Sequence, residues 1–266
     1  MITALIRPAA AIATAFALTL AAAPPGVAQS GAQSGAEPTD VTVRVIAKGA
    51  KFIGTSMGGV RVVLRDAQTG EILADGVTQG GTGDTQRIMR DGIDRKGARW
   101  TPGAAGFNAR LDIDAPVKVR VEATGPLGQP QAASTVTSEQ WIVPGHPVTG
   151  GDAWLLEMPG FAVDILAPAA HSSADGTIRI AANVILMCGC GVSPGGTWDA
   201  DGYEIKAMIY RNDALVDELA LDYAGVMSRF EADYTPDGAG PYRIVVVAYD
   251  EANGNTGLDQ TTVLVN

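Results

Sequence analysis

The sequence is poor in the side chains from which most catalytic sites are built. It has two cysteines, and two histidines, His146 and His171, are the whole supply of imidazole in 266 residues. His146 lies between a Pro-Gly pair and a proline, which is typical of a turn. Two Gly-x-Ser-x-Gly segments, at Ser56 and Ser193, lack the strand-to-helix setting of a nucleophile elbow. We therefore assign no catalytic residues.

Basic residues are scarce relative to acidic ones. Lys and Arg total 19 whereas Asp and Glu total 29, so the formal net charge is -10. A chain of this charge is repelled by the phosphates of nucleic acids and by anionic lipid surfaces. We therefore expect no nucleic-acid partner, whereas cations and cationic partners remain open.

The one long apolar run lies at the N-terminus. Arg7 precedes an alanine-rich run over 9–23, which is followed by two prolines and by small residues up to Ala28. This order is typical of a secretory signal peptide, 1–28, cleaved after Ala28. A permanent membrane anchor is disfavoured because the run is short and alanine-rich. We expect an exported protein, periplasmic or extracellular, with no stable membrane insertion after cleavage and with a flexible leader over 29–40.

The rest of the chain lacks a long apolar pattern of period 3.6 and is rich in turn residues. Between 33 glycines and 15 prolines, Val, Ile and Thr gather in short runs typical of strands. Val41, Val43 and Val45 alternate with polar residues, as in a half-buried strand. Residues 59–66 and 71–77 flank a Gln-Thr-Gly turn and predict a hairpin. Further strands are expected at 107–113, 117–122, 134–143, 153–156, 161–166, 202–210, 240–250 and 261–265, while a short helix remains open for 213–221.

A domain boundary fits the Met-Pro-Gly segment at 158–160, or slightly later Ala167-Pro168. Short strands separated by glycine and proline on both sides of this point indicate sheets packed on sheets. The sequence therefore predicts an all-β protein with two β-sandwich domains, 41–160 and 161–266.

Three features of the second half point to a known type of module. Residues 163–168 read Val-Asp-Ile-Leu-Ala-Pro, a long strand covers 240–250, and Gly-Asn-Thr-Gly at 254–257 precedes the closing strand. In these features the second half resembles a bacterial immunoglobulin-like module, which implies a two-sheet sandwich. Through 59–66, 69–71 and 78–81, the first half resembles the transthyretin-like or carboxypeptidase-regulatory-like sandwich. Modules of this kind most often serve as spacers, adhesion units or accessory domains, which lowers the expectation of an enzyme.

The two cysteines stand on either side of Gly189, directly after Met187. In an oxidising compartment Cys188 and Cys190 can close a small disulfide loop if the backbone turns at Gly189. As thiolates they can hold a soft ion, copper(I) or zinc, with the Met187 thioether and the His171 imidazole as further donors. A strained pair can also act as a redox dithiol, but the flanking sequence lacks a thioredoxin-like context. These three interpretations remain open.

Two other segments have compositions that suit ligands. The connection 80–102 carries mixed charges, which favour a solvated surface with internal ion pairs. Asp250, Asn253, Asn255 and Asp259 offer oxygen donors of the kind that calcium prefers. Their spacing departs from an EF-hand, and turns between strands explain it better.

The cysteine segment gives the function that we predict first, an exported soft-metal (copper or zinc) binding or handling protein with a site at Met187, Cys188, Cys190 and His171. The alternative is a non-catalytic structural or protein-interaction module with a protein partner. In that alternative Cys188 and Cys190 form a disulfide loop, so the two predictions differ in the state of the cysteines.

Overall fold

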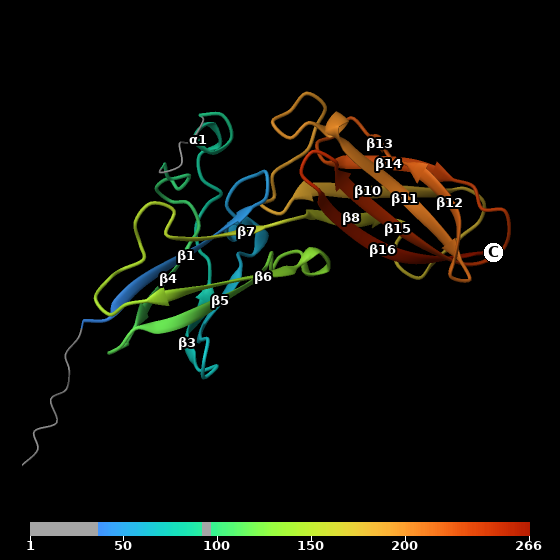
Figure 1. The fold of residues 1–266 in the computed structure, drawn as a ribbon. Coiled ribbons are helices and arrows are strands. Elements are labelled where there is room, and N and C mark those ends of the chain that lie inside the picture. The colour runs from blue at the N-terminus through green and yellow to red at the C-terminus, as the bar shows by residue number, and fades with distance from the viewer. Residues whose placement is uncertain (1–36, 92–96) are drawn as a thin grey trace, which may run out of the picture. The chain divides into compact units, whose positions relative to one another are not determined.

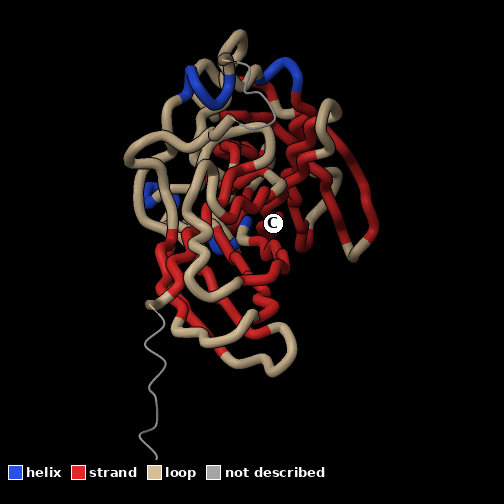
Figure 2. The backbone as a smooth tube through the Cα atoms, turned by 60° about the vertical axis from the view of Figure 1, so that its left-hand side comes forward, coloured by secondary structure: helices blue, strands red, loops and turns tan. Residues whose placement is uncertain are grey.

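A computed structural model describes residues 37–91 and 97–266. The predicted signal peptide 1–28, most of the predicted leader and the centre of the 80–102 connection lie outside the described residues. Regular structure is almost entirely strand (Figure 1), with short helical turns between strands (Figure 2). The turns are η1 (Thr55–Met57), α1 (Thr85–Met89), η2 (Pro130–Ala132) and η3 (Ala200–Gly202). No helix in the described part of the chain is long and apolar enough to cross a bilayer.

Strands β1 to β7 form two sheets, with the orders β4-β1-β7 and β3-β2-β5-β6. Their bounds are β1 (Thr39–Ala47), β2 (Arg61–Asp66), β3 (Ile72–Val77), β4 (Phe107–Leu111), β5 (Val117–Gly125), β6 (Ser134–Ile142) and β7 (Trp154–Met158). The predicted hairpin is confirmed by the antiparallel pairing of β2 with β3. The predicted leader is too long at its C-terminal end, because buried Thr39 already pairs with Leu111 of β4.

The alternation seen in the sequence determines which face of each sheet is buried. Val43 and Val45 of β1 share one apolar core with Val62 and Leu64 of β2, and all four are at most 1% exposed. Apolar surface removed from water stabilises a fold by about 25 cal/mol per Å². The two sheets therefore pack face to face as a sandwich.

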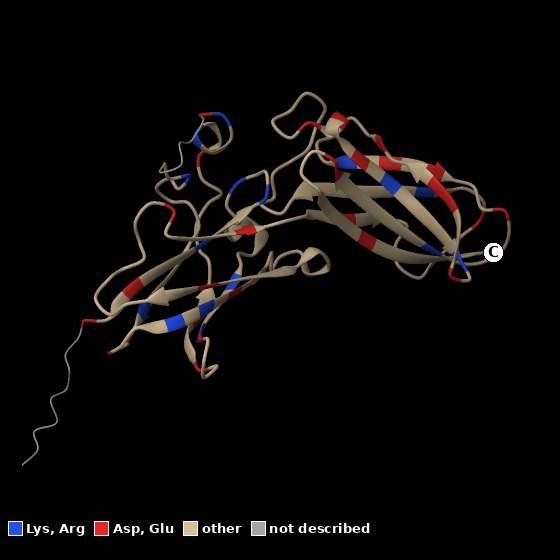
Figure 3. Ribbon diagram, in the orientation of Figure 1, with Lys and Arg blue, Asp and Glu red and all other residues tan. Residues whose placement is uncertain are grey.

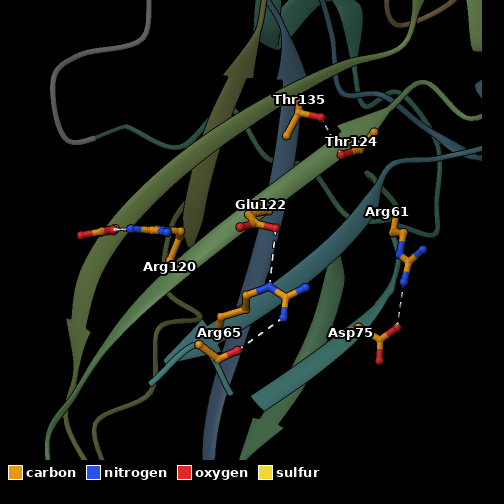
Figure 4. Close-up of polar contacts among 9 residues, drawn as sticks. Arg61, Arg65, Asp75, Arg120, Glu122, Thr124 and Thr135 are labelled. Atoms are coloured by element: carbon orange, nitrogen blue, oxygen red, sulfur yellow. Dashed lines mark hydrogen bonds and ion pairs between the residues drawn. The ribbon is translucent and has the colours of Figure 1, made fainter. Parts of the chain in front are cut away.

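The outer face of the β3-β2-β5-β6 sheet is largely polar and internally paired (Figure 4), with Trp141 of β6 59% exposed beside Lys118. Guanidinium groups lie opposite carboxylates across neighbouring strands, and a pair of threonine hydroxyls extends the row. The contacts are Arg61 with Asp75 at 3.9 Å, Arg65 with Glu122 at 3.6 Å, Arg120 with Glu139 at 2.7 Å, and Thr124 with Thr135 at 2.8 Å. Exposed pairs of this kind contribute little stability each, so this face is a solvated exterior.

Strand β1 is buried on its second face as well, beneath the long connection between β3 and β4. Arg44 is 9% exposed and donates from Nη1 to the carbonyls of Ala104 and Ala105, each at 3.1 Å. Its guanidinium also stacks on Trp100, 4.6 Å from the ring centroid. Burial lowers the pKa of the Arg44 guanidinium, an effect that the Asp152 carboxylate opposes. The charged side chains of 80–102 that the structure describes are exposed, as predicted, while Trp100 anchors the end of the connection on Arg44.

Strands β8 to β16 form two further sheets, with the orders β13-β14-β10-β8 and β12-β11-β15-β16-β9. Their bounds are β8 (Phe161–Ala167), β9 (Ser172–Ala174), β10 (Ile178–Leu186), β11 (Tyr203–Arg211), β12 (Ala214–Ala220), β13 (Asp222–Tyr223), β14 (Arg229–Tyr234), β15 (Gly240–Asp250) and β16 (Asn255–Val265). In immunoglobulin notation these orders are A-B-E-D and A′-G-F-C-C′. The predicted all-β sandwich with an immunoglobulin-like second half is confirmed.

A tyrosine near the start of β15 reinforces this assignment. The hydroxyl of Tyr242 donates to the Gly238 carbonyl at 2.9 Å, and its oxygen lies 3.1 Å from Asp237 Oδ1. A tyrosine at this strand that bonds to the backbone just upstream is the tyrosine corner of immunoglobulin-type sandwiches. Burial raises the pKa of Tyr242, and its hydrogen bond to Asp237 adds to this effect.

Two local expectations differ from the structure because long-range pairing decides them. Residues 213–221, for which a short helix was open, form the edge strand β12, which pairs with β11. Residues 254–257, predicted as a turn before the last strand, lie mostly inside β16. The reason is that β15 pairs with β16 over its whole length, from Asp250↔Asn255 to Gly240↔Val265.

The predicted boundary falls between β7, which ends at Met158, and β8, which begins at Phe161. Within the described ranges no strand pairing joins β1–β7 to β8–β16. Their buried side chains nevertheless belong to one continuous cluster, and Ala36–Asn266 is one compact unit. The division into two domains therefore stays a prediction.

Removing the buried guanidinium tests its role in holding the long connection. We expect Arg44→Ala to lower the free energy of unfolding by about 2 to 4 kcal/mol, because two carbonyls lose a charged donor and Trp100 loses its packing partner. Urea denaturation followed by tryptophan fluorescence measures the change. The matched control is Arg110→Ala on neighbouring β4, since the Arg110 side chain is 73% exposed. Equal losses in the two variants would contradict a structural role for Arg44.

A second prediction concerns Asp164 of β8. Burial raises the pKa of this carboxyl, and the nearby Asp259 carboxylate raises it further. The folded state then binds protons more tightly than the unfolded chain, so stability falls as pH rises through the titration. Asp164→Asn should raise the melting temperature at pH 7, with the gain vanishing near pH 3. Thermal melts across this range measure the effect, and the exposed Asp112→Asn serves as control; a gain that is independent of pH argues against the mechanism.

Candidate functional site

The cysteine segment forms a tight loop at the end of β10. Leu186 N donates to the Cys190 carbonyl at 3.1 Å, and Gly189 N donates to the Leu186 carbonyl at 2.8 Å. Cys188 and Cys190 are joined by a disulfide, with their Cα atoms 5.3 Å apart. Of the three interpretations of these cysteines, the structure has the disulfide loop.

Gly189 makes this loop possible in two ways. Its φ of +77° lies in the left-handed region, which side chains other than glycine rarely adopt. A Cβ atom at this position would also lie 2.8 Å from Sδ of Met57, in η1. The turn that the disulfide required is therefore present, and a thioether packs directly against it.

The loop is an interior element rather than an exposed one. Cys188 is 1% exposed and Cys190 is 7% exposed, and both belong to the apolar core. Beyond the disulfide, Val192 N donates to the Ser228 hydroxyl at 3.1 Å, and Ser228 N donates to the Val192 carbonyl at 2.8 Å. Met227, which precedes Ser228, lies against Gly191. The helical turn η1 and the turn that precedes β14 thus both contact the loop.

Side chains near the loop join it to the connection after β1. The indole Nε1 of Trp198 donates to the Gly49 carbonyl at 3.1 Å. Lys48 Nζ donates to the Asn253 carbonyl at 2.7 Å, and Asn255 Nδ2 donates to the Lys48 carbonyl at 3.0 Å. We call these four residues, Lys48, Trp198, Asn253 and Asn255, the joint. The joint consists of hydrogen bonds between segments far apart in the sequence, half-buried at Lys48 and Asn255 and exposed at Trp198.

The oxygen donors considered for calcium serve the backbone instead. Asp250 Oδ1 accepts from Ala252 N at 2.9 Å, Asn253 Oδ1 from Asn255 N at 2.8 Å, and Asp259 Oδ2 from Ile165 N at 2.8 Å. Asn255 is fully buried, and its Oδ1 accepts from Gly160 N at 3.0 Å. The interpretation as turn and strand-end chemistry accounts for all of them.

The structure brings together three of the four residues proposed as metal ligands. Met187 is buried beside the cysteines, next to Phe161. His171 is exposed, follows the far end of β8, and lies with Nδ1 3.0 Å from Thr262 Oγ1. Leu186, next to Met187, pairs with Phe161 at the N-terminal end of β8. The six residue steps from there to the C-terminal end of β8, about 20 Å, separate the cysteine loop from the segment that carries His171. Sequence reasoning missed Met57 and Met227, since no spacing in the chain relates them to the cysteines.

The described part of the chain contains no group of three or more His, Cys, Asp or Glu side chains placed to hold a metal ion. Methionine is outside that set of donors. While the disulfide is closed, neither sulfur of the cysteines is a thiolate, which is the form that binds metal. The metal hypothesis therefore requires prior reduction of the disulfide.

Comparisons with known proteins add little to this site. No family model matches the chain, and no curated protein does. Among solved structures, an engineered protein is 20% identical with a TM-score of 0.31; the match covers 47% of this chain and 24% of that protein, so this chain spans about a quarter of it. The fibronectin(III)-like modules of Clostridium thermocellum CbhA are 11% identical with a TM-score of 0.27, over 85% of this chain and 90% of theirs. Similarity at this level carries no argument about function.

Proposed function

We propose that this chain is an exported, non-catalytic structural or protein-interaction protein, in which the Cys188–Cys190 disulfide shapes a loop of the core. The observation that carries the proposal is the burial of the closed disulfide against Met57. A pair that exchanges electrons or takes up metal needs access to its sulfur atoms. These sulfur atoms instead serve as packing surface.

The fold fits the same role. The loop lies beside the joint, where the Lys48 and Asn255 side chains connect the segment after β1 to the turn between β15 and β16, and the Trp198 indole connects it to the segment between β10 and β11. The proposed resemblance of β1–β7 to a transthyretin-like or carboxypeptidase-regulatory-like sandwich supports an accessory role as well. A disulfide is consistent with the oxidising compartment that the predicted signal peptide implies.

Replacing both cysteines tests this proposal. We expect Cys188→Ala/Cys190→Ala to fold and to lose about 1 to 2 kcal/mol of stability, because a disulfide that closes so short a loop restricts the unfolded chain only slightly. Circular dichroism and urea denaturation measure this. Met57→Ala, which opens a cavity against the loop, should cost at least as much. Free thiols in protein purified from the oxidising compartment, detected by mass and by thiol reagent, would overturn the proposal.

Soft-metal binding after reduction is a second candidate, favoured by one specific observation. Two thioethers from distant segments, those of Met57 and Met227, lie against the glycines of the loop, in addition to Met187 beside it. Thiolate and thioether donors together suit copper in its reduced state. Reduction of the disulfide to two thiols is the step that would expose these ligands.

Native mass spectrometry tests this candidate. The mature protein is measured as purified, and again after phosphine reduction and addition of one equivalent of copper(I) or zinc. Binding predicts one retained ion in the reduced protein and none in Cys188→Ser/Cys190→Ser. If the reduced protein retains no ion, or the variant retains as much as the parent, soft-metal binding is eliminated and the structural proposal stands unaffected.

A further inference from the structure

A hollow of about 750 Å³ lies on the outer face of the five-stranded sheet. Its floor consists of two rows of side chains in register across β11, β15 and β16. One row is Lys206, Val247 and Leu258, and the other is Glu204, Tyr249 and Thr256. Gln131 and Ala132 of η2 form a wall, and Gln131 Nε2 donates to the Val163 carbonyl at 3.0 Å, which holds this wall in place.

The floor leaves large apolar groups in contact with water. Leu258 is 53% exposed and Tyr249 is 38% exposed; Tyr249 lies between β11 and β16, whereas Leu258 pairs with β15 alone. Val247, between them and Lys206, is half-buried. Covering such a surface with apolar side chains of a partner releases about 25 cal/mol per Å². Contiguous exposed apolar surface in a sheet face is typical of a recognition surface.

Around Lys206 this face has more negative than positive charges, while Arg243 lies farther along it, stacked on Tyr210. Lys206 Nζ lies 2.9 Å from Glu204 Oε1 and 2.9 Å from Glu218 Oε2, so one ammonium is shared by two carboxylates. Elsewhere on the molecule acidic and basic side chains are interspersed along the strands (Figure 3). An anion is thus disfavoured here, and a cation is favoured.

The hollow continues along the sheet toward its edge. A second hollow of about 440 Å³, lined by β11 and β12, shares Glu204 and Lys206 with the first. From β16 to β12 the surface crosses three strand spacings, about 14 Å, which an extended segment of about four residues covers. Its apolar part lies over β15 and β16, and its acidic part over β11 and β12.

We propose that this face binds a short extended segment of a partner protein, in which an apolar side chain covers Leu258 and Val247 and a Lys or Arg side chain pairs with Glu204 and Glu218. Four residues, Glu204, Glu218, Val247 and Leu258, are the binding face. The proposal rests on the interaction role stated above and names its surface and the chemistry of its partner. The basic side chain supplies the charge that Lys206 leaves unbalanced, while the apolar side chain is buried on the exposed floor.

A titration with short peptides tests the binding face. The probe is the acetylated, amidated tetrapeptide Leu-Leu-Lys-Lys, in which a Leu and a Lys two positions apart share one face of the extended chain, and Leu-Leu-Glu-Glu is its charge-reversed counterpart. The readout is amide chemical shifts of the isotope-labelled mature chain. We expect saturable shifts on β11, β15 and β16 with the basic peptide, at least tenfold weaker binding of the acidic one, and weaker binding at high salt.

Matched variants distinguish binding at this face from non-specific binding of the peptide. Glu204→Gln/Glu218→Gln should weaken binding about fivefold, whereas Glu71→Gln, exposed on the β2–β3 turn, should not. Leu258→Ser should weaken binding more than Leu264→Ser, because Leu264 lies on the same strand and face at 47% exposed but outside the hollow. Equal binding of the two peptides, or equal effects of the two leucine variants, overturns the binding face. The disulfide measurement described above is independent of this result, so failure of the face and failure of the interaction role are distinguishable.

Discussion

Strand β1 is covered on both faces, and several other segments of the chain supply the apolar contacts and hydrogen bonds that its buried side chains need. One face packs into the sandwich core, while the other carries Arg44, whose guanidinium needs acceptors once it leaves water. The acceptors are the carbonyls of Ala104 and Ala105, and the ring of Trp100 stacks on the guanidinium. The connection after β3 is long because it must reach this position and return to β4.

The end of β1 extends this constraint to the cysteine loop. Lys48 and Gly49 leave the strand with polar groups that Asn253, Asn255 and Trp198 satisfy. The disulfide loop lies in the same region, with Gly189 against Met57 of η1. A compact turn with its cysteine sulfurs buried suits this place, since bulkier or charged groups would disturb a continuous core. The two cysteines, which stand out in the sequence as possible metal ligands or a redox pair, therefore serve as a buried disulfide that packs in the core.

The outer faces of the sheets differ in how they treat charge. On β3-β2-β5-β6 Arg61 and Arg65 each pair with a carboxylate, and Glu139 is shared by Lys118 and Arg120 (Figure 4). On β11, Lys206 is shared by Glu204 and Glu218, and exposed Leu258 lies across the sheet from them. A face that combines unbalanced charge with exposed apolar surface gains by being covered.

The sequence alone determined many of the strands, since alternation and turn residues act locally: β1, the β2–β3 hairpin, and β11 with its alternating Ile205, Ala207 and Ile209 follow from spacing. Strands β9, β10, β13 and β14 were not predicted, although β10 and β14 are the central strands of their sheet. It also determined the all-β class and the immunoglobulin-like second half. Tertiary structure alone decided the rest. Pairing with β11 made β12 a strand, burial selected the disulfide among three states of Cys188 and Cys190, and packing brought Met57 to the loop while leaving His171 at the far end of β8. These outcomes depend on which distant segments meet, and contacts of that kind leave no periodic trace in the chain.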